Sequence, residues 1–242
     1  MSDLSLTLAA QGIFLTSSAT DKKFGGSPRT SARDQLAALE KRNYCVRLAA
    51  SSDLAALEAL EAACWPAHLR ADGARLAARL AAGATYVATV DGAVAAVLYT
   101  QRIASAAALT TFATQEDACV RASDGATLQL LAVAAHPSRH PLRLGVALRD
   151  FALEQAELDG VTREVVAMTR CSHYARRNAA DGADAAAYAA YVARADDPGL
   201  RFHTSAGAAV VGAVDGYRPE DGDNCGAAVL VRYTVGAAEV AA

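Results

Sequence analysis

Two side chains in the second half of the sequence stand where they could do acid–base or hydrogen-bond chemistry. His203 lies four residues before Gly207 in a short predicted helix over 200–206, and Thr169 follows a predicted strand over 163–168. An imidazole can donate a hydrogen bond to a carboxylate or shuttle a proton near neutral pH. A threonine hydroxyl can hydrogen-bond a carboxylate or a carbonyl oxygen. Taken alone, these residues fit a capping threonine and a half-buried structural histidine at least as well.

A loop between a predicted strand and a predicted helix has the features of an anion site. The strand is the apolar run over 128–133, the chain breaks at His136 and Pro137, and helical spacing of apolar residues runs from Leu144 to a stop at Gly160. The first amide groups of such a helix lack intrahelical partners, and the helix dipole is positive there. The loop therefore offers a place for a pyrophosphate.

The rest of the chain supplies the elements that must position these residues. Asp91 and Gly92 lie between two alternating apolar segments and predict a β-hairpin. The mixture of strands and helices indicates an α+β fold with a mixed sheet, and not a doubly wound parallel sheet. Helices are predicted over 34–42, 54–64, 72–82, 144–159, 183–194 and 200–206, strands over 44–48, 85–90, 94–99, 128–133, 163–168, 209–214 and 227–233, and 103–124 is ambiguous.

Bulk composition narrows the class of protein. The 242 residues are 53% hydrophobic with a formal net charge of −3, and the dispersed basic residues do not form a nucleic-acid surface. The five cysteines are widely spaced without a CxxC pair, which favours reduced thiols inside a cell. No apolar run is long enough to span a bilayer. We therefore expect a cytoplasmic protein that binds neither nucleic acid nor membrane.

The first 43 residues differ from the rest in composition. The segment over 16–31 is polar and rich in Gly, Ser and Thr, which is typical of a linker or tail. Acidic residues are sparse before Asp34, which leaves a weak organelle-targeting signal open, although Asp3 and Asp21 count against it. We expect a flexible tail over 1–43, one domain over 44–235 and a C-terminal tail over 236–242.

The order of elements around the central strand, loop and helix resembles the GNAT acyltransferase fold. The resemblance covers about Tyr44 to Tyr233. In that family the loop before the helix binds the pyrophosphate of coenzyme A, and two neighbouring strands splay apart to admit the pantetheine arm. The resemblance implies that the splayed strands here are 128–133 and 163–168.

The loop itself matches the family pattern in part. That pattern is Gln or Arg, two residues, Gly, one residue, then Gly or Ala, and it falls on His140, Arg143 and Gly145, so that only the last glycine is kept. An alternative register uses Gly145 and Ala147. Arg139 and Arg143 would replace lost backbone donors with charge. The residues that the resemblance implies for coenzyme A are Leu131, Val133, Arg139, His140, Arg143, Gly145 and Ala147.

Five separated segments resemble a narrower group, the GNAT-like starter domains of modular polyketide synthases. In order, they are ACWPAHLR, LQLLAVAAHP, MTRC, LRFHTSAGA and GYRPEDGDNCGA. Such domains decarboxylate malonyl or methylmalonyl thioesters to an acetyl or propionyl starter, and transfer to the phosphopantetheine of an acyl carrier protein has been assigned to them. The resemblance implies a coenzyme A or carrier thioester as substrate, an acyl carrier protein as partner, and no metal.

The same resemblance implies roles for four residues. His203 and Thr169 fall on the catalytic histidine and threonine, where they would orient the carboxylate and stabilise the enolate left by CO2. Trp65 would wall the acyl pocket. Arg218 would face the substrate channel, although a salt bridge to Glu220 or Asp221 is an equal alternative.

Other functions remain open at this point. A conventional N-acetyltransferase would use acetyl-CoA on a small amine, and a non-catalytic module would only bind or dock an acyl thioester. Cys171 next to Thr169 and Arg170 is a weaker candidate, as a thiolate nucleophile. The pair Cys171 and His173 lacks the partners of a zinc motif, and no GxSxG segment marks a serine hydrolase.

Overall fold

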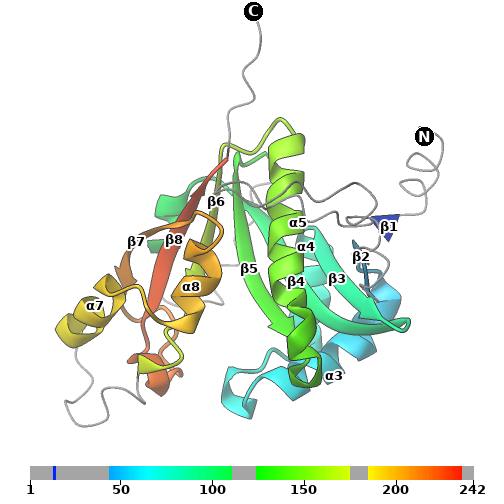
Figure 1. The fold of residues 1–242 in the computed structure, drawn as a ribbon, viewed down its shortest axis with the longest axis horizontal. Coiled ribbons are helices and arrows are strands. Elements are labelled where there is room, and N and C mark those ends of the chain that lie inside the picture. The colour runs from blue at the N-terminus through cyan, green and yellow to red at the C-terminus, as the bar shows by residue number, and fades with distance from the viewer. Residues whose placement is uncertain (1–12, 15–43, 111–123, 175–184, 236–242) are drawn as a thin grey trace, which may run out of the picture.

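The computed structural model describes residues 13–14, 44–110, 124–174 and 185–235, and it is an α+β fold built on one mixed sheet (Figure 1). The described strands form an eight-stranded sheet in the order β1-β2-β3-β4-β5-β6-β8-β7. Only β5 and β6 are parallel neighbours, and the other pairs are antiparallel. The strands are β1 (Ile13–Phe14), β2 (Tyr44–Leu48), β3 (Thr85–Val90), β4 (Ala93–Ile103), β5 (Thr127–Ala135), β6 (Glu164–Thr169), β7 (Ala209–Val214) and β8 (Ala228–Thr234).

Helices cover both faces of the sheet. Residues of α5, α7 and α8 share one apolar cluster with β6 and β8, and residues of α3 and α4 share another with β3 and β4 on the opposite face. In Figure 1, α5 crosses in front of the sheet while α3 and α4 lie behind it. The alternation along β5 agrees with this, since Leu130 joins the α5 cluster and Leu131 joins the α3 cluster. The helices are α3 (Leu54–Cys64), α4 (Gly73–Ala82), α5 (Leu144–Leu158), α7 (Ala185–Ala193) and α8 (Pro198–Thr204).

The two parallel strands separate after a short paired stretch. Their register starts with Thr127 opposite Glu164 and ends with Leu130 opposite Ala167. Beyond these residues β5 continues to Ala135 without pairing with β6. The predicted splay between the two strands is therefore present, and it leaves one edge of the β5 backbone open.

A β-bulge lies at the point of separation. On its other side β5 pairs with β4, where Tyr99 is opposite Ala132 and Thr100 is opposite Leu130, so Leu131 is an extra residue. An extra residue bends its strand and increases the local twist. The bend carries β5 away from β6 just after their last pair.

Several predicted boundaries are confirmed by backbone conformation. Asp91 and Gly92 have φ of 52° and 80°, as a tight hairpin turn requires, and Gly207 ends α8 with φ of 84°. Gly83 follows the last residue of α4, and glycine is needed there because a Cβ would lie 2.1 Å from the Thr100 carbonyl oxygen. Helix α8 begins earlier than predicted, since Asp197 accepts a hydrogen bond from the Gly199 amide at 2.8 Å and caps it.

Other predictions differ from the structure or fall outside it. Strand β4 runs on to Ile103, beyond the predicted end at 99. The predicted helix over 34–42, the linker-like segment over 16–31 and the C-terminal tail over 236–242 lie outside the described residues. The domain boundaries stay a prediction. Across the described residues, no helix has the length and hydrophobicity needed to cross a membrane.

Candidate active site

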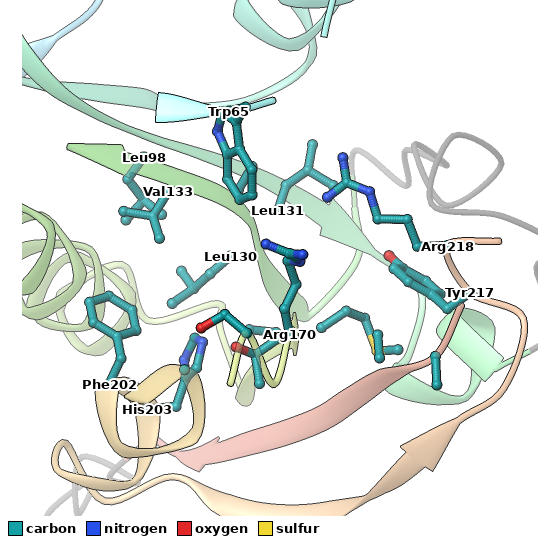
Figure 2. A pocket seen from close by; sticks show the side chains of 18 residues that line it. Trp65, Leu98, Leu130, Leu131, Val133, Arg170, Phe202, His203, Tyr217 and Arg218 are labelled. Atoms are coloured by element: carbon teal, nitrogen blue, oxygen red, sulfur yellow. The ribbon is translucent and has the colours of Figure 1, made fainter. Parts of the chain in front are cut away.

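A cavity of about 350 Å³ opens where β5 and β6 separate, and it gathers the residues predicted to do chemistry (Figure 2). Trp65, Thr169, His203 and Arg218 all line it, although they come from distant parts of the sequence. The two predicted β5 positions, Leu131 and Val133, line it as well. Much of the remaining wall is apolar and includes Leu98, Leu130, Ala167, Phe202, Ala227 and Ala228.

His203 is held by its neighbours in a buried position on α8. Its side chain turns toward the centre of the cavity in Figure 2, and the residue is 6% exposed. Its Nδ1 lies 2.6 Å from the hydroxyl oxygen of Tyr233 on β8. Burial, together with the positive charge of Arg149, lowers the pKa of His203 to about 3. The ring is therefore neutral near pH 7, and of the two roles considered for it, hydrogen bonding and proton shuttling, this favours hydrogen bonding.

Thr169 also lines the cavity, at the end of β6. It is the last residue of β6, where the strand is still paired with Val229 of β8. The residue is buried, and among the described residues its side chain has no hydrogen-bond partner. Its hydroxyl is therefore available to a bound molecule.

Trp65 forms a third wall between two arginines. It follows α3 directly, and its extended backbone (φ −122°, ψ 140°) ends the helix before Pro66, as predicted. The guanidinium carbons of Arg170 and Arg218 lie 5.8 and 5.6 Å from the centre of its ring. These distances allow cation–π attraction between each arginine and the ring.

Arg170 belongs to the site although the sequence analysis did not assign it a role. Figure 2 shows its side chain projecting between His203 and Trp65. It is paired through two nitrogens with Asp221, at 2.8 Å for Nη2, and the Asp221 side chain is 1% exposed. The pair offsets the guanidinium charge. In the sequence, only its position next to Thr169 at the end of a predicted strand indicated that Arg170 could belong to the site.

Arg218 both lines the cavity and takes part in an ion pair. It lines the cavity, and its Nε lies 3.2 Å from a carboxylate oxygen of Glu220. Its Nη2 also donates to the Leu69 carbonyl oxygen at 2.6 Å. Asp221, the other predicted partner, is instead taken by Arg170.

The predicted coenzyme A loop lies beside the cavity and does not line it. Arg143 stands at the start of α5 in a left-handed conformation (φ 50°, ψ 39°), and Gly145 and Ala147 follow in the first turn. A Cβ on Gly145 would lie 3.6 Å from the Val133 side chain, so this turn adjoins the cavity wall. Arg139 is exposed and 3.9 Å from Asp91, and the side chain of His140 lies outside the described part of the chain.

Two further candidates from the sequence have no support in the geometry. Cys171 is fully buried, and burial raises the pKa of its thiol to about 12, so it is protonated near neutral pH and a poor nucleophile. Within the described ranges, no group of three His, Cys, Asp or Glu side chains could hold a metal ion.

Comparison with solved structures identifies the family. The GphF GNAT-like decarboxylase, solved in complex with isobutyryl-CoA, is 40% identical to this chain, with a TM-score of 0.72 over 79% of this chain and 99% of its own. The chain belongs to the GNAT-like decarboxylases. No protein-family model matches it, and no curated protein matches it.

Two other structures agree with the family and with its fold. The loading GNATL domain of CurA from Lyngbya majuscula is 28% identical, with a TM-score of 0.71 over 79% of this chain and 98% of that domain. The ribosomal-protein-S18-alanine N-acetyltransferase from Escherichia coli is 17% identical, with a TM-score of 0.53 over 82% of this chain and 98% of its own. At that identity the acetyltransferase shows a shared GNAT fold and nothing further.

Proposed function

We propose that this GNAT-like decarboxylase removes CO2 from malonyl or methylmalonyl thioesters and so makes an acetyl or propionyl starter for polyketide synthesis. The observation that carries the proposal is the meeting of Trp65, Thr169, His203 and Arg218 at one cavity between the splayed strands. The membership of the family supports the decarboxylation. The choice of substrate rests on the resemblance to starter-loading domains.

The reaction does not require a side chain of the protein to transfer a proton. The bond between the carboxylate carbon and the α-carbon breaks, CO2 leaves, and the electron pair moves into an enolate whose charge lies largely on the thioester oxygen. Water then supplies the proton that adds to the α-carbon. Hydrogen-bond donors aimed at the enolate oxygen lower the barrier, and each is worth roughly 10²- to 10³-fold in rate.

His203 and Thr169 are suited to donate those hydrogen bonds. A neutral imidazole has one N–H to offer, and the Thr169 hydroxyl has no other partner among the described residues. The apolar wall around them disfavours a localised carboxylate charge more than the spread charge of the enolate. Arg170 and Arg218 would hold the carboxylate near Trp65, and the Asp221 partner of Arg170 keeps that attraction moderate.

The open edge of β5 is the proposed path for the pantetheine arm. Backbone groups of Leu131 to Val133 are free of β6 and can pair with the amides of the arm, as an added strand would. The pyrophosphate would then reach the first turn of α5, near Arg139, His140, Arg143, Gly145 and Ala147. An acyl carrier protein is the proposed source or acceptor of the acyl group.

The test is an assay of the purified protein with malonyl-CoA and methylmalonyl-CoA, with and without a carrier protein in its phosphopantetheine form. We expect release of CO2 and formation of acetyl-CoA or propionyl-CoA, and abolition of both by His203→Ala. Consumption of acetyl-CoA by an amine without decarboxylation would instead identify an N-acetyltransferase. Acyl-CoA binding in a calorimeter without turnover would identify a non-catalytic module.

A further inference from the structure

The hydrogen bond between His203 and Tyr233 has a direction that the surrounding residues determine. Nδ1 of His203 and the hydroxyl oxygen of Tyr233 are 2.6 Å apart, and the residues are 6% and 3% exposed. Either atom could carry the shared hydrogen, because a neutral imidazole can be protonated on either nitrogen. The two choices differ in what they leave unpaired.

If Nδ1 carried the hydrogen, the Tyr233 hydroxyl would accept it and would need another acceptor for its own hydrogen. The described residues provide no second partner for that hydroxyl. A buried hydroxyl hydrogen without an acceptor costs about 1–3 kcal/mol. In the opposite arrangement the tyrosine donates to Nδ1, so both atoms of the contact are satisfied and only the Nε2–H remains, on a ring that lines the cavity.

We propose that Tyr233 is a positioning residue that holds His203 as the neutral tautomer with its hydrogen on Nε2, so that the ring presents a fixed donor to the cavity. Nothing in the sequence analysis or the comparisons gives Tyr233 a role. The use of this donor on a thioester oxygen rests on the proposed function. The tautomer itself does not.

A buried cation, Arg149, acts on the pair and also holds the helix that carries His203. Arg149 of α5 is 3% exposed and donates to the carbonyl oxygen of Phe202, in the last turn of α8. Its guanidinium carbon lies 4.9 Å from the centre of the Phe202 ring, and its Nη2 is 2.6 Å from Asp150. A protonated His203 would face this cation while its Nδ1 is hydrogen-bonded to the neutral hydroxyl of Tyr233 on β8. Burial and Arg149 therefore both disfavour the imidazolium.

A donor of this kind differs from a general acid. It stabilises negative charge on an oxygen without transferring its proton, and it needs no reorganisation during the reaction. The ring cannot rotate freely, because Nδ1 is tied to β8 while the Phe202 ring meets the imidazole edge-on at 4.9 Å. Loss of the Tyr233 hydroxyl should loosen the ring and leave the cavity otherwise intact.

The tautomer can be tested on the resting protein by ¹⁵N NMR with labelled histidine, with the His203 signals assigned by their loss in His203→Asn. We expect a protonated Nε2 and an unprotonated, hydrogen-bonded Nδ1, unchanged from about pH 5 to about pH 9. A hydrogen on Nδ1, or an imidazolium in that range, would overturn the proposal. This outcome is independent of whether the protein decarboxylates anything.

The positioning role is tested by Tyr233→Phe, with Tyr174→Phe as the matched control. Both remove one hydroxyl from a buried tyrosine of the same cluster, and the Tyr174 ring packs against Tyr188 and Tyr191 at 4.9 and 5.2 Å. We expect Tyr233→Phe to shift the Nδ1 signal and to lower kcat on the order of 10-fold or more, with KM for the acyl-CoA nearly unchanged. Tyr174→Phe should change neither. An unaltered kcat and Nδ1 signal in Tyr233→Phe would overturn the role.

Discussion

Thr169 and His203 face the same cavity, but they are held there in different ways. His203 is fixed through Tyr233 and is kept neutral by burial and by Arg149. The Thr169 hydroxyl has no partner among the described side chains and is available to hydrogen-bond a bound molecule. We therefore expect substitutions of the two residues to affect activity and stability in different ways.

Thr169→Val should separate activity from stability. Valine has nearly the same shape, and the hydroxyl it removes leaves no partner among the described residues unpaired, so the free energy of unfolding should change by less than about 1 kcal/mol. The decarboxylation rate should fall by roughly 10²-fold, since one donor to the enolate is lost. Thr169→Ser is the control and should keep most of the rate. Full activity in the valine variant would exclude Thr169 from the site.

The lowered pKa of His203 predicts a dependence of stability on pH. The folded pKa of about 3 lies below the ordinary value of 6.5, so the unfolded chain binds this proton first. The contribution to stability is complete above about pH 6.5 and is lost as the pH falls toward about 3. Between about pH 7 and pH 4.5 the loss from this residue is about 2–3 kcal/mol.

Urea unfolding of wild type and His203→Asn at these two pH values measures that loss. The wild type should lose more stability than the variant, because the carboxylates that titrate in the same range are common to both. Equal losses would show that His203 titrates normally in the folded state.

At the scale of elements, the start of α5 combines an unusual backbone with a functional charge. Arg143 precedes the helix at φ 50°, a region that costs a non-glycine residue about 1–2 kcal/mol. A glycine there would relieve the cost. The arginine is consistent with a need for positive charge where the coenzyme A pyrophosphate is proposed to lie.

Arg143→Gly and Arg143→Ala form a matched pair that separates these two effects. Both remove the charge, so KM for malonyl-CoA should rise several-fold in each, and the two values should be similar. Only the glycine variant should gain stability, by about 1 kcal/mol over the alanine variant in thermal unfolding. Equal stability of the two would argue against the left-handed backbone, and an unchanged KM would remove Arg143 from the coenzyme A site.

At the scale of the molecule, two arginines connect the part of the chain up to α5 with the part that follows β6. Arg149 links α5 to the end of α8, and Arg218 links the loop before β8 to the Leu69 carbonyl between α3 and α4. These two halves are also joined by the short pairing of β5 with β6 and by apolar clusters that include residues of both halves. The arginine bridges add to these contacts.

Arg218→Ala should therefore cost more than an ordinary substitution near the surface. Loss of the hydrogen bond to the Leu69 carbonyl and of the contact with Trp65 should lower the free energy of unfolding by about 1–3 kcal/mol. Glu220→Ala removes only an exposed ion-pair partner of the same arginine and should cost less than about 0.5 kcal/mol. Urea unfolding compares the two. Equal, small effects would show that Arg218 does not hold the halves together.

The helices and strands, and several residues of the site, could be predicted from the sequence. Alternation and helical spacing, Asp91–Gly92 at the hairpin and Pro66 after α3 act between near neighbours, so they can be read from the sequence. The site candidates Thr169 and His203 came from a resemblance carried by short segments. Their position at one cavity agrees with it.

Only the tertiary structure decided what state those residues are in and which neighbours support them. The bulge at Leu131 depends on the register with β4, and the neutral state of His203 depends on its burial and on Arg149. The moderated charge of Arg170 depends on Asp221. Each of these is a contact between residues far apart in the chain, and burial and electrostatic shifts arise only when such contacts form. No local pattern in the sequence records them.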